Sequence, residues 1–252
     1  MDKQQWTDEQ IKSWINSQTG DNYWYQTIKI KNGIIIQGTV NSLDRLQQLD
    51  LDDDLSNKTV LDIGCNSGML CLECKRRGAD RVVGIDIQEN RLEQARILAE
   101  IMGLEIEYKN VDLFHAKEMG DFDIVLCIAI LTEITDLLGG LSILKQITRE
   151  KLYLVIATPN SFSPSKSFLG RATDQILDFS LRKVINSIKP TLFKSHYYGN
   201  AKLRKIESKR LKSWALDPDM NFLGAVMGDK FKIIDLGNSV RYRLFKMVRF
   251  SK

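Results

Sequence analysis

Short apolar runs alternate with amphipathic stretches through the middle of the chain, from residue 58 to residue 159. The runs are rich in valine, isoleucine and leucine, which favours buried strands, and the stretches between them repeat apolar residues every three or four positions, which favours helices. Strands are expected at 60–63, 81–86, 105–112, 122–127 and 151–159, and helices at about 69–77, 90–102 and 136–149. This α/β alternation predicts a mostly parallel sheet with helices on both faces.

The two ends of the chain follow other patterns. Thr7 and Gln10 have the spacing of a capping box, which predicts a short helix at the start of an aromatic N-terminal segment. Two apolar runs near the other end are joined by a short Gly-Asn-Ser link and predict a hairpin that adds an antiparallel edge strand. The expected parts are an N-terminal helical cap (1–57), a ligand-binding core (58–159), an insertion or lid on the substrate side (160–228) and a hairpin that completes the sheet (229–252).

An acidic residue followed by a glycine turn joins the first strand of the core to its first helix. Apolar residues surround Asp62, and Gly64 and Gly68 follow, so the backbone can approach a ligand closely at the helix N-terminus. Asp86 ends the next strand, where an acidic side chain suits a pair of ribose hydroxyls. A dinucleotide fingerprint would need glycine at positions 66 and 69, which hold asparagine and methionine. The alternative is an α/β turn whose glycines only permit packing.

The pattern Asp62-x-Gly64-x-x-x-Gly68 resembles motif I of the class I S-adenosylmethionine-dependent methyltransferases. The resemblance implies a Rossmann-like, doubly wound sheet of seven strands and S-adenosyl-L-methionine as the cofactor. Asp62 suits the cationic amino-acid part of that cofactor better than it suits a phosphate. In the family, an acidic residue at the position of Asp112 accepts a hydrogen bond from the adenine amino group. The positions that the resemblance implies for cofactor binding are Asp62, Gly64, Cys65, Asn66, Gly68, Asp86, Ile87, Asp112, Leu113 and Cys127.

Residues 23–26, 32–34 and 43–46 resemble the segment before motif I in the tRNA wobble-uridine carboxymethyl transferases. That subfamily carries a Tyr-His pair after the fourth strand, where this chain has Leu131-Thr132-Glu133, and it has a tryptophan and a lysine that are missing here. These departures count against a carboxylated cofactor and against tRNA as the substrate.

Composition limits the compartment and the chemistry. No apolar run approaches the ~20 residues of a membrane span, and the first residues are polar, so a cytoplasmic protein without a transmembrane segment is expected. Three of the four cysteines, Cys65, Cys71 and Cys74, lie on or beside one loop and helix, and Cys127 lies in a core strand. Buried thiols are therefore expected, rather than a disulfide framework or a metal site.

The net charge of +4 conceals an asymmetry between the two parts of the chain. Residues 1–140 hold 14 basic and 24 acidic residues, whereas residues 141–252 hold 22 and 8. The basic part favours an anionic partner, with a solvated lysine-rich face as the alternative. Within residues 202–212, cations surround apolar positions that fall on one helical face, which predicts a basic helix, either a lid over an anionic substrate or an ordinary surface helix.

Methyl transfer is an in-line displacement, so the protein must mainly align the reactants and exclude water. A hydroxyl acceptor also calls for a base. Glu133, which follows the fourth strand, and His196, which two tyrosines follow in a basic context, are the candidates, while His115 lies closer to the adenine side.

The leading hypothesis is methyl transfer to a polar, anionic small molecule or glycoconjugate. An RNA methyltransferase that uses the basic half as a phosphate track is the first alternative, although the basic stretch has few aromatic residues for base stacking. A non-catalytic binding protein that keeps the fold as a scaffold is the second alternative.

Overall fold

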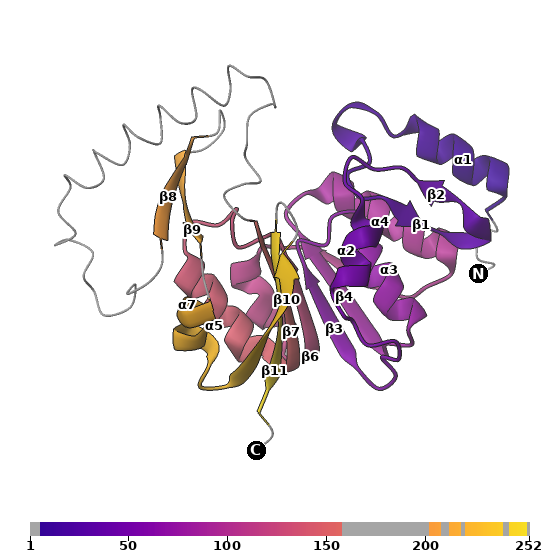
Figure 1. Ribbon diagram of the computed structural model, residues 1–252. Coiled ribbons are helices and arrows are strands. Elements are labelled where there is room, and N and C mark those ends of the chain that lie inside the picture. The colour runs from indigo at the N-terminus through magenta and orange to yellow at the C-terminus, as the bar shows by residue number, and fades with distance from the viewer. Residues whose placement is uncertain (1–5, 158–201, 208–211, 218–219, 239–241, 251–252) are drawn as a thin grey trace.

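A computed structural model of the chain describes residues 6–157, 202–207, 212–217, 220–238 and 242–250. A seven-stranded sheet forms its centre, in the order β10-β11-β7-β6-β3-β4-β5 (Figure 1). The strands are β3 (Thr59–Ile63), β4 (Arg81–Asp86), β5 (Glu107–Asn110), β6 (Phe122–Ile128), β7 (Thr148–Ala157), β10 (Phe231–Asn238) and β11 (Tyr242–Arg249).

Five neighbouring strands, β7 to β5 in the order of the sheet, pair in parallel, and β11 pairs antiparallel with both β7 and β10. The C-terminal hairpin therefore forms one edge of the sheet. The expected fold class, a doubly wound and mostly parallel sheet of seven strands with an antiparallel strand in its edge hairpin, is confirmed.

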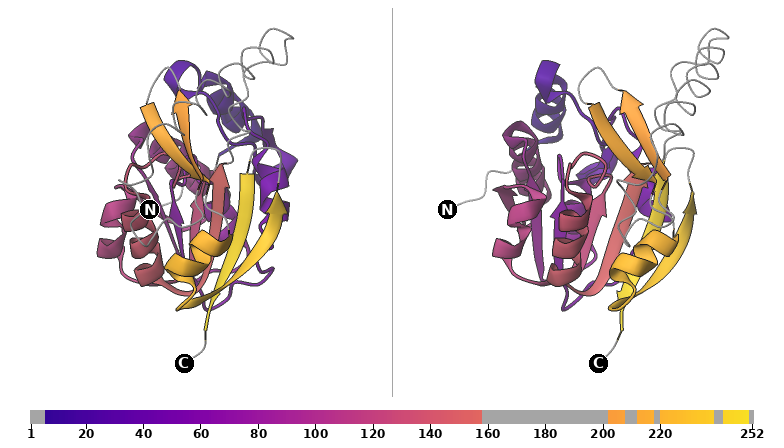
Figure 2. Two further views of the ribbon diagram at one scale, coloured as in Figure 1. Left: turned by 60° about the vertical axis from the view of Figure 1, so that its left-hand side comes forward. Right: turned by 90° about the vertical axis from the view of Figure 1, so that its left-hand side faces the viewer.

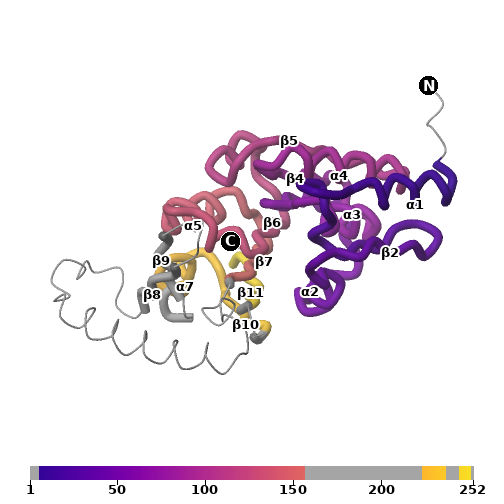
Figure 3. The backbone as a smooth tube through the Cα atoms, turned by 90° about the horizontal axis from the view of Figure 1, so that it is seen from above, coloured from indigo at the N-terminus to yellow at the C-terminus, as the bar shows by residue number. Residues whose placement is uncertain are grey.

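Helices cover both faces of the sheet, and each face has its own hydrophobic core (Figure 3). One core lies under α3 (Met69–Arg76) and α4 (Glu89–Met102), and the other lies under η3 (Leu113–Met119), α5 (Leu137–Ile147) and α7 (Met220–Met227). Successive residues of a strand enter opposite cores, as Val60 and Leu61 do, so the strands are apolar on both faces.

The N-terminal cap packs over the face that carries α3 and α4 (Figures 1 and 2). It contains α1 (Asp8–Ser17), η1 (Gly20–Asn22), β1 (Ile28–Lys29), η2 (Lys31–Gly33), β2 (Ile35–Ile36) and α2 (Ser42–Gln48). The capping box of Thr7 and Gln10 is confirmed. Three tryptophans stack edge to face in this cap, with ring centroids 6.2 Å apart for Trp6 and Trp14 and 5.4 Å apart for Trp14 and Trp24.

An ionic cluster fastens the end of the cap to the sheet. Lys246 Nζ lies 2.8 Å from Asp50 Oδ2, and Lys151 pairs with Asp52. Tyr153 Oη donates to the Asp50 carbonyl at 3.3 Å. The segment that follows α2 is thereby held on β7 and β11.

Residues 202–207 and 212–217 form a pair of antiparallel strands and not the helix expected for the basic stretch. The strands are β8 (Lys202–Glu207) and β9 (Lys212–Asp217) (Figure 2). In their register Lys205 is opposite Trp214. Apolar residues at intervals of three and five positions fit a helical face, but pairing between two short segments leaves no such periodic signal. None of the described residues belongs to a helix that is long and apolar enough to cross a membrane.

Candidate active site

The turn between β3 and α3 uses left-handed backbone at Gly64 and Gly68, with φ of +70° and +80°. A Cβ atom on Gly68 would lie 2.5 Å from Tyr108 Oη, and one on Gly64 would overlap the side chain of Ile130. A side chain at either position would need a strained left-handed backbone and would displace a neighbouring side chain. Asn66 also has positive φ, +53°, and its Oδ1 accepts from the Ser67 N–H at 2.8 Å, which stabilises the turn.

Asp86, at the carboxyl end of β4, is held beside this turn by two main-chain hydrogen bonds. The N–H of Asn66 donates to its Oδ2 and the N–H of Gln88 to its Oδ1, both at 2.9 Å. The carboxylate is only 8% exposed. Because each oxygen keeps a further lone pair, the fixed carboxylate can accept hydrogen bonds from two neighbouring hydroxyls.

Asp62 is a buried carboxyl group in the adjacent strand, 2% exposed. Burial raises the pKa of Asp62 to about 7. The Cys71 thiol, which donates to Asp62 Oδ2 at 3.4 Å, lowers the pKa in part, and the negative charge of Asp86 raises it further. A cation bound next to Asp62 would favour the ionised form and lower the pKa. The site therefore fits a ligand that brings a positive charge.

Gln26, in the N-terminal cap segment, hydrogen-bonds to two main-chain groups at the start of α3. Its Nε2 donates to the Cys65 carbonyl and its Oε1 accepts from the Met69 N–H, both at 3.3 Å. The helix has no side-chain cap of its own at Gly68. A residue that is distant in sequence thus satisfies a donor that a helix start leaves unpaired.

Asp112 lies across the cavity, at the start of η3. Its Oδ1 accepts from the Phe114 and His115 N–H groups at 2.9 and 3.1 Å and lies 2.7 Å from His115 Nδ1. The His115 contact and these N–H groups lower the pKa of Asp112. Ile87 and Phe114 stand nearby as exposed apolar side chains, a combination that suits an aromatic base with an amino group.

These groups line one cavity of about 740 Å³ at the carboxyl edge of the sheet. It brings together most of the residues predicted from the sequence: Asp62, Gly64, Asn66, Asp86, Ile87, Asp112, Leu113 and Glu133. The volume is that of a typical ligand site.

Three other predicted residues lie outside the wall of this cavity. Cys65 and Cys127 are buried in the cores on the two faces of the sheet, and Gly68 is covered by Tyr108 and Ala95. His196 lies outside the described residues. All four cysteines are free, as expected, and the described residues contain no group of three or more His, Cys, Asp or Glu side chains that could hold a metal ion.

The cavity wall also contains residues that were not predicted, and six of them are Tyr23, Tyr25, Gln26, Ser42, Arg45 and Arg91. All of these six except Arg91 belong to the N-terminal cap. The likeness of residues 23–26 and 43–46 to a family segment is the sequence signal that could have identified four of them, Tyr23, Tyr25, Gln26 and Arg45.

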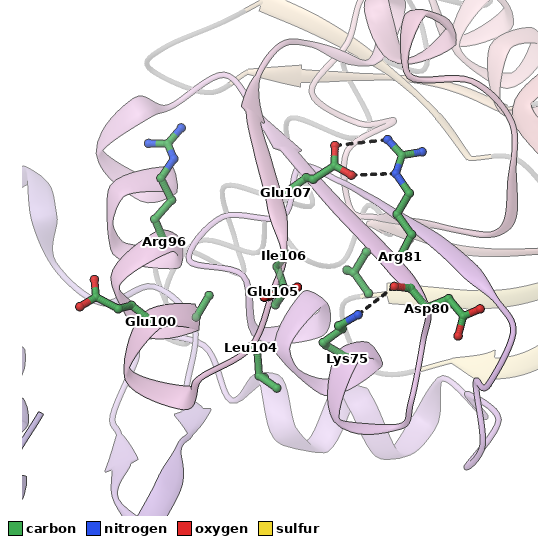
Figure 4. A pocket seen from close by; sticks show the side chains of 11 residues that line it. Lys75, Asp80, Arg81, Arg96, Glu100, Leu104, Glu105, Ile106 and Glu107 are labelled. Atoms are coloured by element: carbon green, nitrogen blue, oxygen red, sulfur yellow. Dashed lines mark hydrogen bonds and ion pairs between the residues drawn. The ribbon is translucent and has the colours of Figure 1, made fainter. Parts of the chain in front are cut away.

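A second hollow of about 530 Å³ lies between the amino ends of β4 and β5 and the last turns of α3 and α4 (Figure 4). Its charged groups are bonded within the protein: Arg81 Nε lies 2.8 Å from Glu107 Oε1, and Lys75 Nζ donates to the Asp80 carbonyl at 2.9 Å. It lies at the edge of the sheet opposite to the glycine turn, so it does not share the candidate active site.

The chain matches known methyltransferases in sequence and in fold. Residues 54–209 match the family model described as a methyltransferase domain. The chain is 31% identical over 167 residues to a ubiquinone biosynthesis O-methyltransferase of Neisseria meningitidis (serogroup A / serotype 4A), a match that covers 65% of this chain and 68% of the relative. Matches to ubiquinone biosynthesis O-methyltransferases of N. meningitidis serogroup C and a Ruegeria species span about half of those proteins, 50% and 46%.

Two solved structures have the same fold. The N-terminal domain of EvdMO1 with SAH bound superposes with a TM-score of 0.61 and 16% identity over 98% of both chains. Magnesium protoporphyrin IX methyltransferase from Synechocystis PCC 6803 with bound SAH gives 0.53 and 20% over 85% of this chain and 90% of that one. Family model, relatives and site geometry agree: the chain belongs to the methyltransferase-domain family and is a class I S-adenosylmethionine-dependent methyltransferase.

Proposed function

We propose that the enzyme methylates an oxygen atom of a polar, anionic small molecule or glycoconjugate. One observation carries this proposal: the exposed carboxylate of Glu133 lines the same cavity as the buried carboxylates of Asp62 and Asp86. The relative from N. meningitidis, named as an O-methyltransferase, supports oxygen as the methylated atom. Its name supports a small-molecule acceptor as well.

Glu133 is the candidate base because it lines the cavity after β6 and because hydrogen bonds within its loop hold it there. The N–H of Glu133 donates to the Ile130 carbonyl at 2.8 Å, and the Thr132 hydroxyl donates to the Ala129 carbonyl at 3.3 Å, so the loop after β6 folds into a turn. Ala129 itself has φ of +61°, a conformation that costs an alanine about 1 kcal/mol. Ala129, Ile130, Thr132 and Glu133 of this turn line the cavity at the end of β6.

The cofactor, when bound, supplies a methyl group on a sulfonium, which leaves as a neutral thioether. Glu133 would accept the proton of the acceptor's hydroxyl group as the oxygen of that hydroxyl bonds to the methyl carbon. Asp62 would hold the cofactor's ammonium group, Asp86 its ribose and Asp112 its adenine amino group. Arg45, which is half-buried on the same wall, would attract an anionic group of the acceptor.

A methyl-transfer screen tests this proposal. Hydroxybenzoates, sugar phosphates and glycosides would be offered with S-adenosylmethionine carrying a labelled methyl group, and the product bond would be assigned by NMR. Glu133→Gln should lower kcat about 10²- to 10⁴-fold for an alcohol acceptor, the usual contribution of a general base. Glu118→Gln, at an exposed carboxylate outside the cavity wall, is the matched control. Label on nitrogen or carbon, or full activity of Glu133→Gln, would contradict the proposal.

RNA stays as the alternative acceptor because residues 141–252 are strongly basic. An electrophoretic shift with bulk tRNA at two salt concentrations separates the two acceptors, since phosphate contacts weaken steeply with salt. Strong, salt-sensitive binding together with methyl transfer to tRNA would favour RNA, and no binding at low salt would exclude it. His196 remains a second candidate base.

A further inference from the structure

Arg91 is a buried cation on the wall of the cofactor cavity, only 3% exposed. It lies in the first turn of α4, five residues after Asp86. Its Nη1 donates to the main-chain carbonyl of Tyr23 and lies 3.4 Å from Gln94 Oε1, and both acceptors are neutral. Burial of a cation among neutral partners is unfavourable. A function at the cavity would explain why the site keeps it.

The side chain that Arg91 contacts most closely is itself part of the cavity wall. The guanidinium carbon of Arg91 lies 4.5 Å from the centroid of the Tyr23 ring, within the range of a cation–π contact. Tyr23 is 44% exposed and lines the cavity with Asp86 and Gln88. Arg91 thus contacts both the main-chain carbonyl and the ring of Tyr23, which fixes the ring beside Asp86, the carboxylate expected to bind the ribose.

A buried chain of hydrogen bonds joins this pair to the glycine turn. The Ser67 hydroxyl donates to Gln94 Oε1 at 2.8 Å, and Gln94 Nε2 donates to the Asn22 carbonyl at 2.6 Å. Ser67 and Gln94 are 0% and 2% exposed. The turn that contacts the cofactor and the segment that carries Tyr23 are therefore coupled through α4.

We propose that Tyr23 closes the ribose side of the bound cofactor and that Arg91 is the positioning residue that holds it there. In this arrangement the cofactor, and its demethylated product S-adenosylhomocysteine, leave only when Tyr23 moves away from the cavity. Arg91 thereby controls how long the cofactor side stays occupied, whatever the acceptor is.

The dissociation rate of S-adenosylhomocysteine, measured by stopped-flow displacement, tests the proposal without an acceptor. Tyr23→Ala and Arg91→Met should each dissociate about tenfold faster than the parent, whereas Tyr23→Phe, which keeps the ring, should match the parent. Rescue by Tyr23→Phe distinguishes ring contact from a role of the phenol hydroxyl.

Asn90→Ala is the matched control for a purely structural role. Asn90 Nδ2 holds the same segment from the same helical turn, donating to the Asp21 carbonyl at 3.0 Å and to Asn22 Oδ1 at 3.1 Å, but it does not line the cavity. This variant should dissociate at the parent rate. Unchanged dissociation from Tyr23→Ala, or equal acceleration by Asn90→Ala, would overturn the proposal. If Arg91→Met does not fold, the variants of the partly exposed Tyr23 decide the question.

Discussion

Replacing Asp62 with asparagine should stabilise the ligand-free protein at high pH and weaken cofactor binding. Burial raises the pKa of Asp62 from 3.8 to about 7. One pKa unit corresponds to ~1.4 kcal/mol, so ionised Asp62 destabilises the ligand-free fold by about 4 kcal/mol. Because the folded pKa is the higher one, this penalty is absent below the unfolded value and grows as pH rises from about 4 to about 7. An asparagine does not ionise and escapes it.

Urea unfolding of parent and Asp62→Asn at about pH 5 and about pH 8 measures this penalty. The advantage of the variant in unfolding free energy should be about 2 to 3 kcal/mol larger at the higher pH. Other titrating groups are common to both proteins and cancel in the difference. Asp121→Asn, at an exposed site, is the control. An advantage of equal size at the two pH values would refute the assignment of the raised pKa to Asp62.

Although Asp62→Asn should stabilise the ligand-free fold at high pH, it should weaken cofactor binding there. Loss of a charge-assisted bond to the ammonium group, worth ~1.5–3 kcal/mol, should weaken S-adenosylhomocysteine binding by Asp62→Asn at least about tenfold at pH 8. The affinity of the parent should fall as pH drops below about 7, because protonation of Asp62 removes the charge that pairs with the ligand. A variant that binds as tightly as the parent at pH 8 would place the ammonium group elsewhere.

Three further changes test other parts of the site. Asp86→Ala should weaken S-adenosylhomocysteine binding at least about tenfold in calorimetry, because the ribose contacts are lost; an unchanged dissociation constant in a folded variant would place the ribose elsewhere. Gln26→Leu should lower the unfolding free energy by about 1 kcal/mol in urea titration, since the Met69 N–H loses its acceptor, and unchanged stability would show that solvent replaces this cap. Arg204→Gln with Lys205→Gln should raise the Michaelis constant of an anionic acceptor and leave cofactor affinity unchanged; kinetics equal to the parent at low and physiological salt would dismiss the basic stretch as a lid.

Local patterns predicted the core of the fold, and contacts between distant segments decided the rest. Gly64 and Gly68 could be read from the sequence because the turn needs their backbone conformation, and Asp86 because it ends a strand at a known edge. Arg91 could not, because its place on the cavity wall depends on how the cap packs on α4, and Tyr23 had only the likeness of residues 23–26 to a family segment as its signal. The prediction of a helix within residues 202–212 was wrong for a similar reason, since strand pairing depends on a partner segment and not on local periodicity.

The hydrogen bonds of Gln26 at the N-terminus of α3 affect how far the chain can be shortened from its N-terminal side. The match to the family model begins at residue 54, so a fragment cut there would keep the whole glycine turn, Asp62 and Asp86. It would lack Gln26, and with it the side chain that bridges the Cys65 carbonyl and the Met69 N–H. In this enzyme the segment matched by the family model therefore leaves out part of the wall of the candidate cofactor cavity, and a shortened or chimeric version without the N-terminal cap should be less stable at the start of α3.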